Sequence, residues 1–337
     1  MSETAVPVSG QEAEAFDTRA LCRLRDHMQT RVLGQPELID RMLIALLADG
    51  HLLVEGAPGL AKTTAIKELA DGLEADFQRV QFTPDLLPGD LTGTEVFRPQ
   101  SGEFVFQRGP LFHHLVLADE INRAPAKVQS ALLEAMAERQ ITVGGKTYPL
   151  EDPFLVMATQ NPIEQEGTYP LPEAQLDRFL MYVRIGYPPA EVERAILELA
   201  RRSEGQRGEQ SDESFPARVT RAQLFAARDE VRRLHMAPAV EEYVLQLVLA
   251  TRKPGAYAQE LERWVTFGAS PRATIALDRC ARAHAWLRDS DYVSPADVQA
   301  VALDVLRHRV LVSYEAEAEG VTPDHVVSTL LAQVPVA

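Results

Sequence analysis

The sequence predicts an α/β fold with a mostly parallel sheet and two inserted β-hairpins, followed by a helical domain. Three observations lead to this prediction. Short apolar runs alternate with longer helical patterns from about residue 31 to residue 185, which is typical of β-α-β units. Two glycine-containing segments break that alternation. After Tyr187-Pro188-Pro189 the strand signals fade and helical patterns take over.

The predicted elements follow from the spacing of apolar residues and turn residues. Strands are expected at residues 51–54, 77–82, 115–117, 154–157 and 179–185, with helices at 36–48 and 62–73. Residues 97–106 and 141–150 each place a glycine turn between apolar ends and predict hairpins. Further helices are expected at 190–202, 221–235, 238–252, 271–288 and 294–306. A loop is expected at 203–216, and a short strand pair within 309–316.

Composition limits the class of protein. The chain has 337 residues, of which 46% are hydrophobic and 25% charged, as in ordinary soluble proteins of about two domains. No run reaches the roughly 20 apolar residues of a membrane span. Residues 1–16 lack the basic and apolar regions of a signal peptide, and Cys22 and Cys280 lie far apart. We therefore expect a cytoplasmic protein without a membrane span.

The net charge of −15 argues against sequence-independent binding to nucleic acid. A phosphate backbone is bound by clustered Lys and Arg side chains, which displace its counterions. We therefore expect a protein partner and no nucleic acid.

The first motif is Gly56-Ala57-Pro58-Gly59-Leu60-Ala61-Lys62-Thr63, between a predicted strand and a predicted helix. This is the context of a phosphate-binding loop. The glycines and the helix N-terminus direct N–H groups at an anion, Lys62 reaches the β- and γ-phosphates, and the Thr63 hydroxyl ligates Mg²⁺. Thr64 is counted with the loop. An ordinary glycine turn, the alternative, does not account for the whole context.

Ala61 departs from the general phosphate-loop signature. It occupies the position at which that signature has its last glycine. The loop must therefore adopt a conformation there that accepts a Cβ atom.

The second motif is an apolar run that ends in two adjacent carboxylates, Asp119 and Glu120. Its place after the phosphate loop suits a Walker B strand. Asp119 is expected to bind the Mg²⁺ shell through water, and Glu120 to polarise the water that attacks the γ-phosphate. The alternative is a helix-capping Asp119 beside a solvated Glu120.

The third motif is a strand that runs into Thr159-Gln160-Asn161-Pro162. The neutral amide of Asn161 can donate and accept hydrogen bonds, which suits a residue that orients the attacking water or contacts the γ-phosphate. Taken alone, Asn-Pro is a turn signal. The functional interpretation requires this strand to belong to the same sheet.

These motifs resemble the MoxR family of AAA+ ATPases over nearly the whole chain after about residue 20. The resemblance also extends to residues 119–124, 158–162, 171–179 and 270–273. Family members carry alanine at the position of Ala61. The resemblance implies ATP and Mg²⁺ as cofactors, a ring of six subunits, and hairpins that are the helix-2 and pre-sensor insertions. It places a flexible N-terminus at residues 1–20, an αβα nucleotide-binding domain at 21–187 and a helical lid at 188–337.

Two arginines acquire roles through the same resemblance. Arg178 matches the arginine finger that reaches a neighbouring subunit's nucleotide, and Arg272 matches the second sensor, which contacts the phosphates from the lid. A guanidinium group suits both roles because it neutralises the charge that develops on the γ-phosphate. The alternatives are a surface salt bridge of Arg178 with Asp177 or Glu173, and a solvated Arg272. Arg123 is a third candidate for the subunit boundary.

The implied function is an ATP-driven chaperone that assists the maturation of client enzymes, together with a partner that carries a von Willebrand factor A domain. One alternative is a nucleic-acid motor whose hairpins follow DNA. Residues 97–106 hold one Arg and one Glu and residues 141–150 a single Lys, which is too little charge for a phosphate track. Another alternative is a nucleotide-gated switch with little turnover. The sequence does not identify the client.

Overall fold

A five-stranded parallel sheet forms the centre of the first half of the molecule. The computed structural model describes residues 17–162, 167–205 and 217–336. The strand order is β2-β5-β8-β1-β9, and every neighbouring pair is parallel. The strand bounds are β1 (Leu52–Glu55), β2 (Phe77–Gln81), β5 (Leu115–Asp119), β8 (Leu155–Gln160) and β9 (Met181–Arg184). The five strands predicted from the apolar runs are confirmed.

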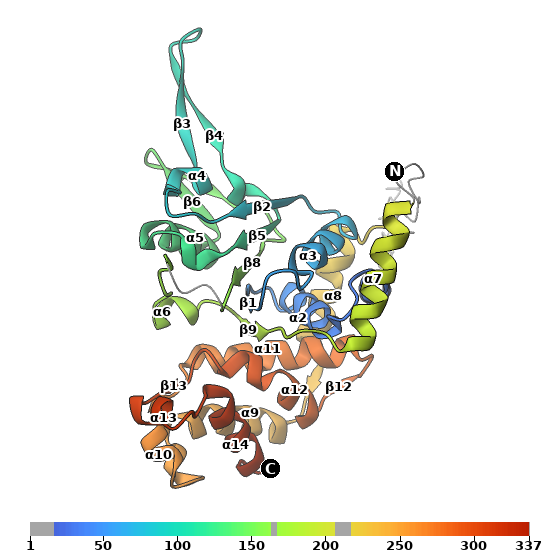
Figure 1. The fold of residues 1–337 in the computed structure, drawn as a ribbon, viewed down its shortest axis with the longest axis vertical. Coiled ribbons are helices and arrows are strands. Elements are labelled where there is room, and N and C mark those ends of the chain that lie inside the picture. The colour runs from blue at the N-terminus through green and yellow to red at the C-terminus, as the bar shows by residue number, and fades with distance from the viewer. Residues whose placement is uncertain (1–16, 163–166, 206–216, 337) are drawn as a thin grey trace, which may run out of the picture.

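Helices cover both faces of this sheet (Figure 1). Leu52 and Val54 of β1 belong to a cluster with α1 (Ala20–Arg31), α2 (Pro36–Leu47) and α3 (Lys62–Asp71). Leu53 belongs to the opposite cluster, with α5 (Ala126–Glu138). Successive side chains of a strand point to opposite faces, so a strand covered on both sides reads as a continuous apolar run. The predicted αβα arrangement is confirmed.

The helical domain packs against the sheet domain through α11 and α12. α11 contacts α2, and α12 contacts β9. The cluster on the α2 face of the sheet therefore continues into the lid without a break. The helix bounds are α7 (Ala190–Gly205), α8 (Arg221–Arg233), α9 (Pro238–Arg252), α10 (Leu261–Trp264), α11 (Pro271–Leu287), α12 (Pro295–Leu306), α13 (Tyr314–Ala318) and α14 (Pro323–Gln333). The lid orientation is thus set by a shared core.

Two hairpins interrupt the α/β alternation, as predicted. After α4 (Pro88–Thr92), β3 (Gly93–Arg98) pairs with β4 (Glu103–Arg108), and β6 (Gln140–Val143) pairs with β7 (Lys146–Pro149). The β3–β4 hairpin projects far from the body of the molecule (Figure 1). Phe97 and Phe104 are exposed near its tip, with ring centroids 5.3 Å apart.

The strand pair predicted within residues 309–316 is wrong. β13 (Leu311–Val312) pairs with β11 (Val265–Phe267), far away in the sequence, and α13 follows at once. Ser313 explains the change of structure, because its Oγ accepts a hydrogen bond from the Ala316 N–H and caps that helix. In the second short pair, β10 (His235–Met236) lies beside β12 (Tyr292–Val293).

Two predictions from the ends and loops of the chain are only partly covered by the structure. Most of residues 1–20 lie outside the described residues, and α1 begins at Ala20. Residues 203–205 end α7, and the rest of the predicted loop to residue 216 also lies outside them. Within the described ranges, no helix has the length and apolarity that crossing a bilayer requires.

His51 joins the start of β1 to two neighbouring elements. Its Nδ1 accepts from the Val156 N–H at 3.1 Å, and its Nε2 lies 3.2 Å from the Met136 carbonyl oxygen. A ring with one accepting and one donating nitrogen is neutral. Burial, with a smaller effect from the Arg139 cation, lowers the pKa of His51 to about 4.

We expect His51 to make the stability of the protein depend on pH. The pKa of His51 is about 4 in the folded protein and 6.5 for an unperturbed histidine. The unfolded state therefore binds more protons between these values, and the free energy of unfolding falls as the pH decreases through them. The difference corresponds to about 3 kcal/mol. Urea unfolding at several pH values should show a weaker dependence for His51→Gln, and an unchanged dependence would contradict the assignment.

Candidate nucleotide-binding site

Most of the residues predicted to hold nucleotide line one cleft at the carboxyl edge of the sheet. The cleft has a volume of about 340 Å³. It is lined by Pro58, Gly59, Leu60, Ala61, Lys62, Thr63, Thr64, Arg79, Asp119, Glu120 and Asn161. These residues come from the loop after β1, the first turn of α3, the ends of β5 and β8, and β2. The structure therefore brings the three sequence motifs together.

The phosphate loop depends on backbone conformations that few residues adopt. Gly59 has φ +83°, and Ala61 has φ 56° in the left-handed region just before α3 begins. An alanine accepts that region at a cost of about 1–2 kcal/mol. A Cβ on Gly56 would lie 2.4 Å from Ile185 Cγ1, so only glycine fits there. Ala61 thus keeps the turn for which the general signature uses glycine.

The Lys62 ammonium lies inside the cleft. Its Nζ donates to the Gly56 carbonyl oxygen at 2.6 Å. Burial lowers the pKa of Lys62, while the Asp119 and Glu120 carboxylates act in the opposite direction. A desolvated ammonium group interacts strongly with an anion, so the site is suited to a phosphate group.

Both oxygens of Asp119 have partners. Thr159 Oγ1 donates to Oδ1 at 2.6 Å, and Arg79 Nη2 donates to Oδ2 at 2.5 Å. Sequence analysis assigned no role to Arg79. It lies on β2, whose Gln81 is in register with Asp119 of β5. That neighbourhood depends on the strand order, which no local pattern reveals.

Glu120 is held by side chains from two directions. Gln81 Nε2 donates to Oε2 at 2.9 Å, and Arg123 Nε lies 3.2 Å from the same oxygen. The Glu120 N–H donates to Thr159 Oγ1 at 2.9 Å. Arg123 thus contacts the Glu120 carboxylate of its own chain. Asn161 is buried where β8 ends. Sequence analysis also missed Gln81.

A second pocket adjoins the phosphate loop. It has a volume of about 350 Å³ and is mostly apolar, with Leu60, Pro162, Ile185 and Tyr187 among its lining residues. Gly56 and Ala57 of the loop border it as well. A flat apolar group attached to a phosphate in the cleft would fit there. No sequence motif indicated this pocket.

A magnesium ion fits the donors in the cleft. Thr63 and Asp119 both line it. Mg²⁺ prefers oxygen ligands and keeps several waters, and it is held largely by the phosphates of its nucleotide. Among the described residues, no group of three or more His, Cys, Asp or Glu side chains could hold a metal without such phosphates.

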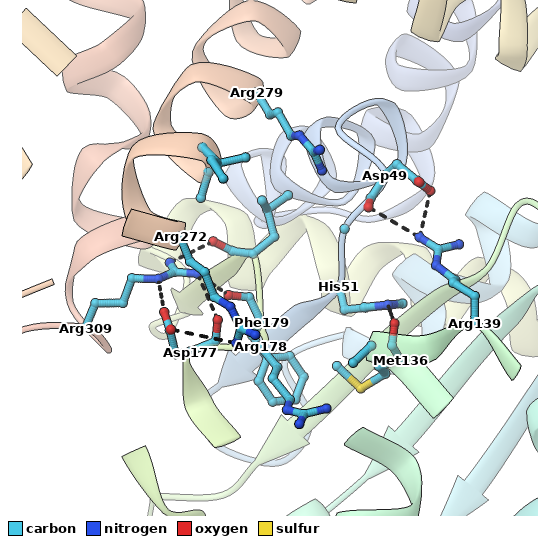
Figure 2. Close-up of a pocket in the computed structure, with 15 residues that line it drawn as sticks. Asp49, His51, Met136, Arg139, Asp177, Arg178, Phe179, Arg272, Arg279 and Arg309 are labelled. Carbon is cyan, nitrogen blue, oxygen red and sulfur yellow. Dashed lines mark hydrogen bonds and ion pairs between the residues drawn. The ribbon is translucent and has the colours of Figure 1, made fainter. Parts of the chain in front are cut away.

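Arg178 and Arg272 do not line this cleft, and both line another cavity (Figure 2). That cavity has a volume of about 390 Å³ and lies between the sheet domain and the lid. Arg178 Nη1 donates to the Leu133 carbonyl oxygen at 2.8 Å. Over the described ranges, the ion pairs include none between Arg178 and Asp177 or Glu173, so the proposed alternative for Arg178 is not observed.

Arg272 lies at the start of α11 and lines the cavity between the sheet domain and the lid, not its own chain's phosphate cleft. Its contact with phosphates from the lid stays a prediction. Ser270 Oγ donates to Asp177 Oδ2 at 2.9 Å, which fixes the start of α11 beside the segment that carries Arg178. Arg272 Nη1 lies 3.8 Å from the same carboxylate, and its side chain is 58% exposed.

Known proteins resemble the chain over most of its length. The ATPase family associated with various cellular activities (AAA) matches residues 51–181, and the AAA lid domain matches residues 258–330. Chaperone MoxR1 of Mycobacterium tuberculosis is 45% identical, over 97% of this chain and 85% of its own. Protein MoxR of Methylorubrum extorquens is 32% identical, over 90% and 92%. The chain belongs to the MoxR family of AAA+ ATPases.

A solved structure supports the same assignment. A candidate ATPase from Cytophaga hutchinsonii is similar to this MoxR-family chain with a TM-score of 0.87 and 45% sequence identity. The match covers 95% of this chain and 96% of that one. The similarity therefore includes both the sheet domain and the lid of the MoxR-family fold.

We expect Lys62→Ala to weaken ATP binding by about 100-fold or more, because it removes a desolvated cation from the cleft. Titration with a fluorescent ATP analogue measures the effect. Lys67→Ala is the matched control, since it removes the same charge from an exposed position on the same helix. Equal affinities for the two folded variants would contradict the site.

Proposed function

We propose that this chain is an Mg²⁺-dependent ATPase that remodels client proteins as a chaperone. The observation that supports it most directly is the single cleft that holds Lys62, Thr63, Asp119, Glu120 and Asn161. This set supplies a phosphate cation, two metal contacts, a carboxylate beside the attacking water and an amide that orients it. The name of the Mycobacterium tuberculosis relative, Chaperone MoxR1, supports the chaperone role.

The proposed catalytic step uses the carboxylate of Glu120. In the structure, Gln81 and Arg123 both contact Oε2 of this carboxylate. The other oxygen, Oε1, is therefore the one that would polarise water beside a γ-phosphate, while Asp119 keeps its hydrogen bond to Thr159 beside the metal.

We further propose that the active form is a ring, with six copies as in the family pattern. Arg178 and Arg272 are exposed side chains beside a cavity that is separate from their own phosphate cleft. A nucleotide bound to a neighbouring copy is the ligand that two such guanidinium groups suit, because its triphosphate carries several negative charges. Each site is then completed across a subunit boundary.

Partners and location are the remaining parts of the proposal. A protein with a von Willebrand factor A domain is the partner that the family resemblance suggests, and the client has not been identified. The two cysteines are free, and burial raises the pKa of Cys280 to about 12. Free cysteines are typical of a reducing compartment, which supports a cytoplasmic location.

We expect Glu120→Gln to keep ATP binding and to reduce turnover by about 100-fold or more, since an amide keeps the shape but cannot accept a proton from water. Steady-state phosphate release and nucleotide affinity should be measured on the same preparation. Undetectable turnover in the unsubstituted protein would favour the switch, and strong stimulation by DNA would favour the nucleic-acid motor. Near-normal hydrolysis by Glu120→Gln would place the catalytic carboxylate elsewhere.

We expect Arg178→Ala to bind ATP but to lose hydrolysis, because the guanidinium group is proposed to act on a neighbour. Arg178→Ala and Glu120→Gln subunits should be inactive separately and regain activity when mixed, since an intact Glu120 then meets an intact Arg178 at some interfaces. Thermal unfolding of Arg178→Ala should be nearly unchanged, as expected for an exposed side chain. Verified mixed rings without any recovered turnover would argue against action between subunits.

A further inference from the structure

A buried arginine of the helical domain holds the short segment that carries the predicted arginine finger. Arg309 lies just after α12, and its side chain is only 3% exposed. Its Nε donates to the Asp177 carboxylate at 2.8 Å. Its Nη groups donate to the carbonyl oxygens of Asp177, Phe179, Leu180 and Val305 at 2.5 to 3.4 Å. All five N–H donors of the guanidinium group therefore have an acceptor.

The carbonyl groups that Arg309 binds lie on both sides of Arg178 in the sequence. Asp177 precedes the finger, and Phe179 and Leu180 follow it. The guanidinium group of Arg309 thus forms hydrogen bonds with the backbone before and after Arg178, while the Arg178 side chain points away from Arg309 (Figure 2). Because the backbone is held on both sides, the position from which the Arg178 side chain extends is fixed.

Other lid residues hold the same segment. Ser270, at the start of α11, donates to the second carboxylate oxygen of Asp177 at 2.9 Å. His308 Nε2 lies 3.2 Å from the Phe179 carbonyl oxygen. The segment that carries the finger belongs to the sheet domain in sequence, and the Leu180 N–H also donates to the His51 carbonyl oxygen at 2.8 Å. The contacts from the lid add to this attachment and couple the position of the segment to the orientation of the lid.

We infer that Arg309, paired with Asp177, is a positioning residue for the arginine finger. It fastens the finger's backbone to the lid, so the orientation of the lid in one subunit sets the position of Arg178 at the neighbour's γ-phosphate. The inference rests on the proposed function, because it requires Arg178 to act between subunits. It goes beyond that function by naming the contact through which lid movement changes the activity of the next subunit.

A purely structural role is the competing explanation. Loss of one partner from a buried ion pair leaves an uncompensated charge and destabilises a protein whatever the pair's function. Stability measurements alone therefore do not distinguish the two explanations. The two explanations differ in which nucleotide site of a ring loses activity. A positioning role impairs the site of the neighbouring subunit and leaves the cleft of the substituted subunit intact.

Arg309→Met is the first test variant. We expect it to bind fluorescent ATP with an affinity within about threefold of the unsubstituted protein, and to lose about tenfold or more in turnover, since a small misplacement of a catalytic group is costly. Turnover within about threefold of that of the unsubstituted protein would overturn the inference.

Mixing experiments locate the damage. Arg309→Met mixed with Glu120→Gln should regain activity, because the first supplies an intact cleft and the second an intact finger. Arg309→Met mixed with Arg178→Ala should not, because neither supplies a working finger. Recovered activity in the mixture of Arg309→Met with Arg178→Ala would overturn the inference. So would a lack of recovery in the mixture of Arg309→Met with Glu120→Gln, provided that the mixture of Arg178→Ala with Glu120→Gln does recover.

Arg228→Met is the matched control. Arg228 is 4% exposed, donates to the Leu46 carbonyl oxygen at 2.9 Å and pairs with Asp49 at 3.1 Å, and neither partner belongs to residues 177–180. It should lower thermal stability but keep turnover within about threefold below its unfolding temperature. If Arg309→Met does not fold, Asp177→Asn, which keeps the size of the side chain, should give the same mixing pattern with a smaller loss. Turnover that is absent from the unsubstituted protein would contradict the proposed function before any variant is compared.

Discussion

The parallel alignment of the five strands is the constraint on which the candidate site depends. Because the strands run in one direction, their carboxyl ends meet at one edge, and the residues that follow β1, β5 and β8 become neighbours. Backbone hydrogen bonds tie these ends together, with the Gly56 N–H donating to Gln160 at 3.2 Å and the Phe82 N–H to Asp119 at 2.8 Å. The apolar clusters on both faces hold the strands in that register.

Polar partners then give the two carboxylates at this edge defined positions. Asp119 is fixed by Thr159 and Arg79, and Glu120 by Gln81 and Arg123. Side chains held in this way lose little further entropy when they act on a ligand, which is the physical basis of preorganisation. Ala61 and Glu120 also adopt left-handed backbone conformations at this edge. Strained backbone of this kind is common where function requires a particular geometry.

A series of ion pairs connects the end of β1, directly before the phosphate loop, to the lid. The pairs lie 2.6 to 3.3 Å apart and link Glu55 with Arg184, Arg184 with Asp324, Asp324 with Arg307, Arg307 with Asp304, and Asp304 with Arg41. Arg184 is 42% exposed, whereas Arg41, Arg307 and Asp304 are largely buried. Exposed and buried ion pairs both contribute little net stability, because solvent screening or desolvation offsets the attraction. These ion pairs depend strongly on the orientation of the lid, since a shifted lid would leave charged side chains without their partners. The shared apolar core holds the lid in place, and these pairs specify its orientation.

Local patterns in the sequence predicted the secondary-structure elements and most of the candidate site residues of this protein. Apolar runs, glycine turns and helical periods are local, so they predicted the five strands, both hairpins and the main helices, and the motifs predicted Lys62, Asp119, Glu120 and Asn161. Only the tertiary structure decided which elements are neighbours. Arg79 and Gln81 became site residues because β2 lies beside β5, and Arg309 reaches the finger segment across more than a hundred residues of sequence. Arg272 lines the cavity between the two domains for the same reason, since the packing of α11 against α2 fixes where the first turn of α11 lies.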